Sequence, residues 1–250
     1  MSALSAQIAM ELRRLYRNPR YLLFTILLPA TFYIFFRALF GDTEVAGIGR
    51  SGIFLLVSST AYGVMAATLI SFAGRIAIER QRGWFSLLLT TPVTMRVVLG
   101  AKVVAALVAS TGVVLAMFAL GIAINGPGAL PVTTWLALAA VLVLGALPFV
   151  ALAFCVGYLF DADTAWSASL WLYFALAMIG GVFTPVEMMP SALQQIAVLT
   201  PAYRYAKLGW DLAAGQPVAV EHVVSLGGYL AVFGLLAVVA YRRNFVARYT

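Results

Sequence analysis

The sequence predicts an all-α integral membrane protein with six transmembrane helices. Of its 250 residues, 63% are apolar and only 10% are charged, against roughly 25% charged in an ordinary soluble domain. The mean hydropathy is +0.99. The charged residues are too few to cover the surface of a soluble domain, and they gather between alternate apolar runs. Soluble, disordered and fibrous classes are therefore excluded, and a soluble catalytic domain of ordinary size has no room.

A basic amphipathic stretch at residues 1–20 precedes the first apolar run. It carries Arg13, Arg14, Arg17 and Arg20. A cleavable signal peptide also has a basic start, but this run has full spanning length and no clear small-residue cleavage site follows it. We expect a helix lying in the cytoplasmic membrane interface, followed by a retained first span.

Six apolar runs are long enough to cross a bilayer, which takes about 20 helical residues. The third run ends at the turn signal Asn125-Gly126-Pro127-Gly128, and the fifth ends at Thr184-Pro185. Pro29 and Pro148 lie inside runs, where we expect kinks, since neighbouring helices satisfy the freed carbonyls. The predicted spans are residues 21–40, 53–74, 103–124, 134–160, 164–183 and 223–241.

The charges predict the orientation of these spans. Six spans place both termini on one side, and if that side is cytoplasmic it carries 12 of the 16 basic residues. The net charge is then +8 inside and −1 outside, as the positive-inside rule expects. The basic excess is thus a topology signal, and no nucleic-acid partner is expected.

Two polar segments do not span. Residues 75–102 combine charges, Gly83 and an apolar cluster that includes Trp84 and Phe85. Either a plain charged loop or a short helix on the cytoplasmic face fits this composition, and the apolar cluster favours a helix covered by lipid or a partner. Residues 185–221, on the outer side, fit either an ordinary long external loop or a re-entrant hairpin of two short helices, and the polar stripe opposite aromatic rings favours the hairpin. In that hairpin Tyr203, Tyr205 and Trp210 are expected at headgroup depth.

Several motifs in these two segments resemble the type-2 ABC transporter permease family. The first group is Glu79-Arg80-Gln81-Arg82-Gly83, Leu87-Leu88-Leu89-Thr90-Thr91-Pro92 and Gly100-Ala101-Lys102. The second is Phe183-Thr184-Pro185, Met189-Pro190 and Leu199-Thr200-Pro201. Ser86 stands where the family has Glu, Ala101 splits the Gly-Lys pair, and Thr200 replaces an Asn. Small export permeases of the daunorubicin- and multidrug-resistance type are most similar in size and layout.

The resemblance implies the permease half of an ATP-driven exporter in the cell membrane, moving a hydrophobic or amphipathic drug or lipid outward. Two copies, or one copy and a homologue, would pair through the first and fifth helices. Two cytoplasmic ABC ATPase subunits would bind ATP and Mg²⁺ and dock on a coupling helix between the second and third spans. The residues that would couple to the ATPase are Glu79, Arg80, Gly83, Trp84, Phe85, Leu88, Thr91 and Pro92.

The residues themselves argue against other activities. No Gly-Lys pair and hence no P-loop occurs, so ATP hydrolysis is assigned to another chain, and no cofactor is expected here. His222 and Cys155 are the lone residues of their types, too few for a metal site or a disulfide. No catalytic residue is predicted, since the Gly-x-Ser-x-Gly pattern is absent. No carboxylate lies at the centre of a span, which disfavours ion-coupled transport.

A substrate path is predicted from aromatic enrichment, although lipid-facing rings would give the same pattern. Its candidates are Phe32, Tyr33, Phe36, Trp166 and Trp171. Two alternatives stay open: a dedicated glycan or lipid exporter subunit, and an ATPase-independent membrane channel or scaffold.

Overall fold

The computed structural model describes residues 3–17, 19–40, 44–45, 49–84 and 93–246. Nearly all of these residues are helical, and the two short strands pair Glu44 with Arg50 and Val45 with Gly49. The elements in order are α1 (Ala3–Tyr16), α2 (Pro19–Phe40), β1 (Glu44–Val45), β2 (Gly49–Arg50), α3 (Ser51–Met65), η1 (Ala66–Ile70), α4 (Ser71–Gln81), α6 (Met95–Asn125), α7 (Val132–Leu144), α8 (Leu147–Leu159), α9 (Ala162–Ile179), η2 (Val186–Met188), α10 (Ser191–Ala197), α11 (Pro201–Ala213) and α12 (Val220–Val246).

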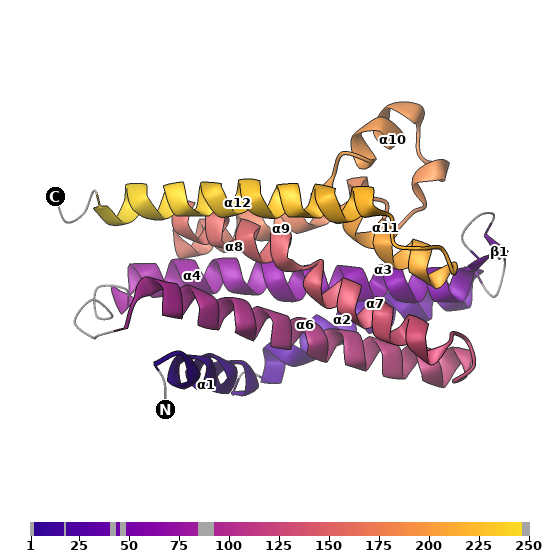
Figure 1. Cartoon of the computed structure of the whole chain (residues 1–250), viewed down its shortest axis with the longest axis horizontal. Helices are drawn as coiled ribbons and strands as arrows, with labels where there is room; N and C mark the ends of the chain where they lie inside the picture. Colours follow the sequence, from indigo (N-terminus) through magenta and orange to yellow (C-terminus); the bar gives the residue numbers. More distant parts are fainter. Residues whose placement is uncertain (1–2, 18, 41–43, 46–48, 85–92, 247–250) are drawn as a thin grey trace.

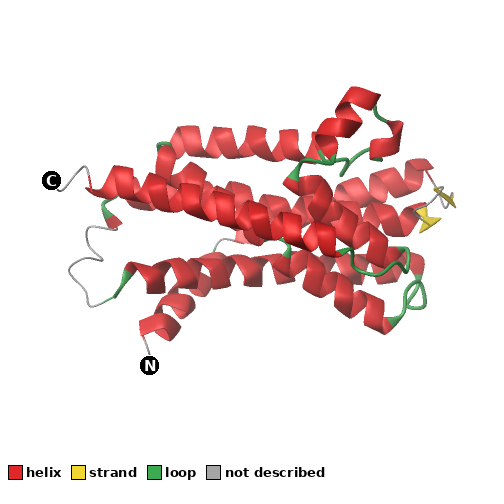
Figure 2. Cartoon of the chain, turned by 45° about the horizontal axis from the view of Figure 1, so that its top comes forward, coloured by secondary structure: helices red, strands yellow, loops and turns green. Residues whose placement is uncertain are grey.

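The long helices form an elongated bundle, side by side along one axis (Figures 1 and 2). Both chain ends lie at the same end of this bundle, where α4 ends and α6 begins (Figure 1). We call this the termini end. The β1–β2 pair and the turn from α6 to α7 lie at the opposite end, and the helix α1 lies along the first half of α6 (Figure 1).

The core of the bundle is one continuous helical rod, from Ser51 to Gln81. Every residue of α3 is buried, and a π-helical turn, η1, joins it to α4. Buried hydroxyls bond within the rod, as Thr60 donates to the Leu56 carbonyl at 2.6 Å. At 1.5 Å per residue its 31 residues measure about 46 Å, which exceeds the roughly 30 Å of a hydrocarbon core. The helix therefore continues well beyond the predicted span 53–74.

The predicted span 134–160 is divided into two helices. Pro148 does not kink a continuous helix; it lies in the first turn of α8, where its missing N–H costs nothing. The break falls at Gly145–Ala146, where the Ala146 amide bonds to Val143 instead of Leu142. The freed Leu142 carbonyl accepts from the Tyr205 hydroxyl at 2.7 Å. A Cβ at Gly145 would lie 2.7 Å from the Tyr205 ring, so glycine permits this approach.

The hairpin between α9 and α12 contains the two predicted short helices, α10 and α11. Thr200 caps α11 by accepting from the Tyr203 amide at 3.2 Å. The expected placement of Tyr205 and Trp210 in the lipid headgroups is wrong, because both are buried in protein, at 0% and 6% exposure. Trp210 donates to Ser58 Oγ at 3.0 Å and stacks on Phe54. Polar bonding partners inside the bundle thus draw the rings away from the membrane interface.

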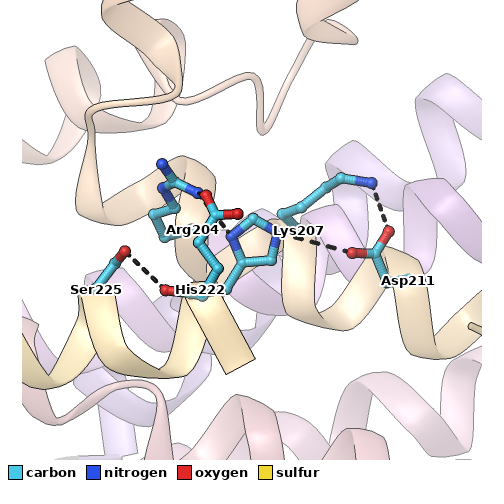
Figure 3. A network of polar contacts seen from close by, with 6 residues as sticks. Arg204, Lys207, Asp211, His222 and Ser225 are labelled. Atoms are coloured by element: carbon cyan, nitrogen blue, oxygen red, sulfur yellow. Dashed lines mark hydrogen bonds and ion pairs between the residues drawn. The ribbon is translucent and has the colours of Figure 1, made fainter. Parts of the chain in front are cut away.

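A polar network fastens α11 to the start of α12 (Figure 3). Arg204 pairs with Glu221 and contacts His222 Nδ1 at 3.0 Å. His222 Nε2 lies 3.9 Å from Asp211, which also pairs with Lys207. Among the described residues, no three His, Cys, Asp or Glu side chains are placed to hold a metal ion.

Four of the described helices are long and apolar enough to cross a membrane. They correspond to the second, third, fourth and sixth predicted spans. The other two predicted spans correspond to α2, whose apolar stretch Thr25–Leu39 is shorter, and to α9. Large apolar side chains on α12, such as Val224 and Leu235, are about two-thirds exposed. Such a surface needs lipid around it, so the chain is a helical membrane protein.

Candidate functional site

The candidate site lies at the termini end, where α4 ends and α6 begins. Helix α4 stops at Gln81, and Gly83 follows with φ of +69°, a conformation that glycine adopts without a Cβ penalty. Thr94, with extended backbone angles, precedes α6. Much of the predicted region 75–102 is therefore helical, because residues 75–81 belong to the end of α4 and residues 95–102 form the start of α6.

Helix α1 binds the side of α6 through one face. Gln7, Glu11 and Leu15, spaced four residues apart, are its buried residues. Spacing of four places side chains on one helix face. The centre of that face is a carboxylate, Glu11, which is completely buried. A buried charge of this kind requires a charged partner.

Lys102 of α6 supplies that partner and also binds α4. Its Nζ lies 2.9 Å from Glu11 Oε1 and 2.6 Å from Glu79 Oε2, and the lysine side chain is only 1% exposed. Arg14 completes the group, with its Nη1 2.9 Å from Glu79 Oε1 and 3.9 Å from Glu11. We call these four residues the anchor network. Its two positive and two negative charges balance, and it joins α1, α4 and α6.

Trp84 lies directly against the anchor network. The Arg14 guanidinium carbon lies 5.0 Å from the centre of the Trp84 ring, within range of a cation–π contact. The indole Nε1 is buried without a hydrogen-bond partner among the described residues. Trp84 thus begins the connection to α6 while held by a residue of α1.

Arg80 joins α4 to the end of α8. It donates to the Phe160 carbonyl at 2.6 Å and also to the Tyr158 carbonyl. These belong to the last turn of α8, whose carbonyls lack partners within the helix. Asp161 then caps α9, and the Thr164 amide and hydroxyl that donate to its carboxylate hold its pKa below the usual range.

The structure brings together four of the predicted coupling residues and leaves the other four outside the described residues. Glu79, Arg80, Gly83 and Trp84 gather at the termini end, and the charges of Glu79 and Arg80 are already engaged within the chain. Phe85, Leu88, Thr91 and Pro92 lie outside the described residues.

The other three residues of the anchor network were not predicted from the sequence as site residues. Glu11 and Arg14 were interpreted as charges of the interfacial N-terminal helix, and Lys102 as part of the Gly100-Ala101-Lys102 motif; none was predicted to bind Glu79. A lone acid in a basic stretch and a lysine opening an apolar run are the available signals. Glu11 and Lys102 are 91 residues apart, so no local periodicity pairs them.

The predicted path residues do not share one surface. Phe32 forms edge contacts with Tyr62 and Phe183 and lies near Phe36. Tyr33 is fully buried and accepts from Asn125 Nδ2 at 2.6 Å.

The two tryptophans of the predicted path, both on α9, are more exposed. Trp166 lines a cavity between α2, α4 and α9, whereas Trp171 is 76% exposed and lines none of the described cavities. The five residues are thus divided between the bundle interior, one cavity and the surface.

Comparison with known proteins fits this architecture. Residues 3–207 match the family model described as ABC-2 type transporter. The chain is also similar to YvfS of Bacillus subtilis (strain 168), whose name classes it as a transport permease. The two are 29% identical over 237 residues, covering 95% of this chain and 96% of the relative. The chain therefore belongs to the ABC-2 type transporter family, as a membrane permease component of an ABC transporter.

Proposed function

We propose that the chain is the permease subunit of an ATP-driven exporter in the cell membrane, moving a hydrophobic or amphipathic molecule outward. Its six spans would be α2, the rod from α3 to α4, α6, the pair α7–α8, α9 and α12. Both termini would then lie in the cytoplasm. The family membership supports an ATPase partner, and the clustering of basic residues toward the termini end supports the orientation.

The observation that carries the proposal is the anchor network. The segment between α4 and α6 is flanked by two helices that Lys102 and Glu79 tie together, and α1 braces both. A force applied to this segment would move α4 and α6 as one body instead of bending a loop. Since α4 continues into the buried core rod, such movement would reach the centre of the bundle.

A second permease copy is part of the proposal. Helices α2 and α9 each leave large apolar side chains exposed, among them Phe35 at 58% and Trp171 at 76%. These faces suit pairing of the first and fifth spans. Disulfide cross-linking in membranes between a Phe35→Cys copy and a co-expressed Met178→Cys copy, both with Cys155→Ala to remove the native thiol, tests this pairing. A dimer band supports it, and a monomer under full oxidation contradicts it.

The ATPase partner is tested by purifying the tagged full chain from its native membranes and assaying retained Mg-ATP hydrolysis. We expect a P-loop subunit to co-purify, and Trp84→Ala to lower its retention at least tenfold, because buried aromatic anchors carry much of an interface's binding energy. Leu136→Ala, which removes an exposed apolar side chain of α7 outside the proposed interfaces, is the control and should retain the wild-type amount.

Two results would contradict the proposal. If the wild-type chain retains no P-loop subunit, an ATPase-independent channel or scaffold is the better explanation. If the Trp84→Ala and Leu136→Ala variants retain equal amounts, the connection between α4 and α6 is not the docking segment.

A further inference from the structure

A cavity of about 620 Å³ lies between α2, η1–α4 and α9. Its walls are mainly apolar, with Leu28, Ile70 and Leu170 from the three elements. Gly74 keeps it open beside Trp166, because a Cβ at Gly74 would come within 3.3 Å of that ring. Cavities of this size hold small molecules or single acyl chains.

One basic group, Arg75, faces this apolar space. Its Nη1 atom is buried and has no hydrogen-bond partner among the described residues. The guanidinium carbon lies 5.7 Å from the Phe72 ring, which covers one side without bonding to the N–H groups. In the described part of the chain, no carboxylate forms an ion pair with it.

The other buried or half-buried basic groups near the termini end have partners. Lys102 and Arg14 belong to the anchor network, and Arg80 binds the end of α8. Asp163 also lines the cavity, but it is exposed to solvent and its charge is therefore screened. Buried polar groups normally have partners, so the buried Nη1 of Arg75, which has no partner among the described residues, indicates an anionic ligand.

We infer that this cavity binds an amphipathic molecule by an anionic head group, a phosphate or a carboxylate. Arg75 contacts the head group, since a guanidinium matches both anions with two parallel hydrogen bonds. The apolar chain lies along Leu28, Ile70 and Leu170. The inference rests on the proposed function, because it names the substrate class of the exporter.

The test measures binding to the purified full chain in a neutral maltoside detergent, without any ATPase, by native mass spectrometry. The probe is dodecyl phosphate, and dodecyltrimethylammonium is its cationic counterpart. We expect Arg75→Met to weaken dodecyl phosphate binding at least tenfold and Arg75→Lys to restore part of it. Binding of the cationic probe should not change.

Arg96→Met is the matched control, because Arg96 is an exposed arginine in the first turn of α6 at the same end. It should change dodecyl phosphate binding less than twofold. Leu170→Trp, which fills the cavity and keeps Arg75, should also cost at least tenfold, and it serves if Arg75→Met does not fold. Wild-type binding in a folded Arg75→Met or Leu170→Trp variant, or an equal loss in Arg96→Met, overturns the inference.

A second arm identifies the source of the anion. Phosphatidic acid is titrated against dodecyl phosphate, and the tighter ligand shows whether a membrane lipid or a single-chain amphiphile is preferred; either preference supports the site. Because no ATPase takes part, loss of the ATPase assignment leaves this result standing. Failure of this test likewise leaves the proposed ATPase coupling untouched.

Discussion

Replacing Lys102 with methionine tests the anchor network most severely. The substitution keeps the length of the side chain and removes the charge that lies 2.9 Å from Glu11 and 2.6 Å from Glu79. Glu79 keeps Arg14 at 2.9 Å, but Glu11, fully buried, keeps only Arg14 at 3.9 Å. Leaving a buried charge without its partner costs about 3–5 kcal/mol.

Release of α1 is the first expected consequence, because Glu11 can reach water if this helix undocks. At 1.4 kcal/mol per tenfold change, this cost corresponds to an opening of α1 that is about 100- to 4000-fold more frequent. Limited trypsin digestion of the full chain in detergent measures it, as cleavage at the arginines of α1. Arg13→Met, which removes an exposed arginine from the same helix, is the control for a lost basic residue and should leave cleavage elsewhere in α1 unchanged.

A compensating variant separates charge from packing. Glu11→Gln added to Lys102→Met removes both buried charges of one pair and leaves the Arg14–Glu79 pair intact. We expect cleavage to fall by about twofold to a hundredfold from the single variant, since contacting charged residues couple by about 0.5–3 kcal/mol. A change of less than about threefold in Lys102→Met, or faster cleavage of the double variant than of the single one, would show that the buried charges do not hold α1 in place.

Two further predictions concern the bundle. Tyr205→Phe should lower the free energy of unfolding by about 1–3 kcal/mol, because the Leu142 carbonyl loses the donor it has at 2.7 Å. The control is Tyr16→Phe, on a ring that is 70% exposed, which should change the free energy of unfolding by less than about 0.5 kcal/mol. Equal effects of the two substitutions would contradict a stabilising hydrogen bond from Tyr205. The hydrogen bonds from Thr164 lower the pKa of Asp161, so the stabilisation that Asp161 gives to the start of α9 is present above the unfolded pKa and is lost as pH falls through the folded pKa. On acidification, hydrogen exchange of the Thr164 amide should therefore become faster than the ordinary pH dependence of exchange predicts. Asp161→Asn should abolish that additional increase.

The helical architecture could be predicted because apolar runs and turn signals are local properties. Asn125–Gly128 ends α6 where expected, and the two hairpin helices lie where their prolines placed them. Helix α9 instead ends at Ile179, before the predicted end at Thr184–Pro185, because Gly180 and Gly181 follow it and Gly181 has a positive φ. Boundaries that depend on partners could not be predicted. Helix α4 continues through Arg75–Gln81 because Glu79 and Arg80 find partners on α6 and α8. The break before α8 depends on the Tyr205 hydroxyl, which comes from α11.

The position of the candidate site could be predicted from the sequence, but its contacts could not. The motif around Glu79–Gly83 located it, whereas its chemistry depends on contacts across the bundle. Glu79, predicted to contact the ATPase, instead forms ion pairs with Lys102 and Arg14 inside the chain. An unpaired guanidinium such as that of Arg75 is likewise invisible to composition, because Arg75 and Arg80 look alike in the sequence and differ only in what surrounds them.

Site-specific photocross-linking in native membranes tests the central claim most directly. A cross-linking amino acid is placed at Trp84, at the termini end, and separately at Pro127, in the exposed turn between α6 and α7 at the opposite end. We expect position 84 to capture a P-loop ATPase subunit and position 127 to capture none. Capture from position 127, or from neither position while the ATPase co-purifies, would contradict coupling through the connection between α4 and α6.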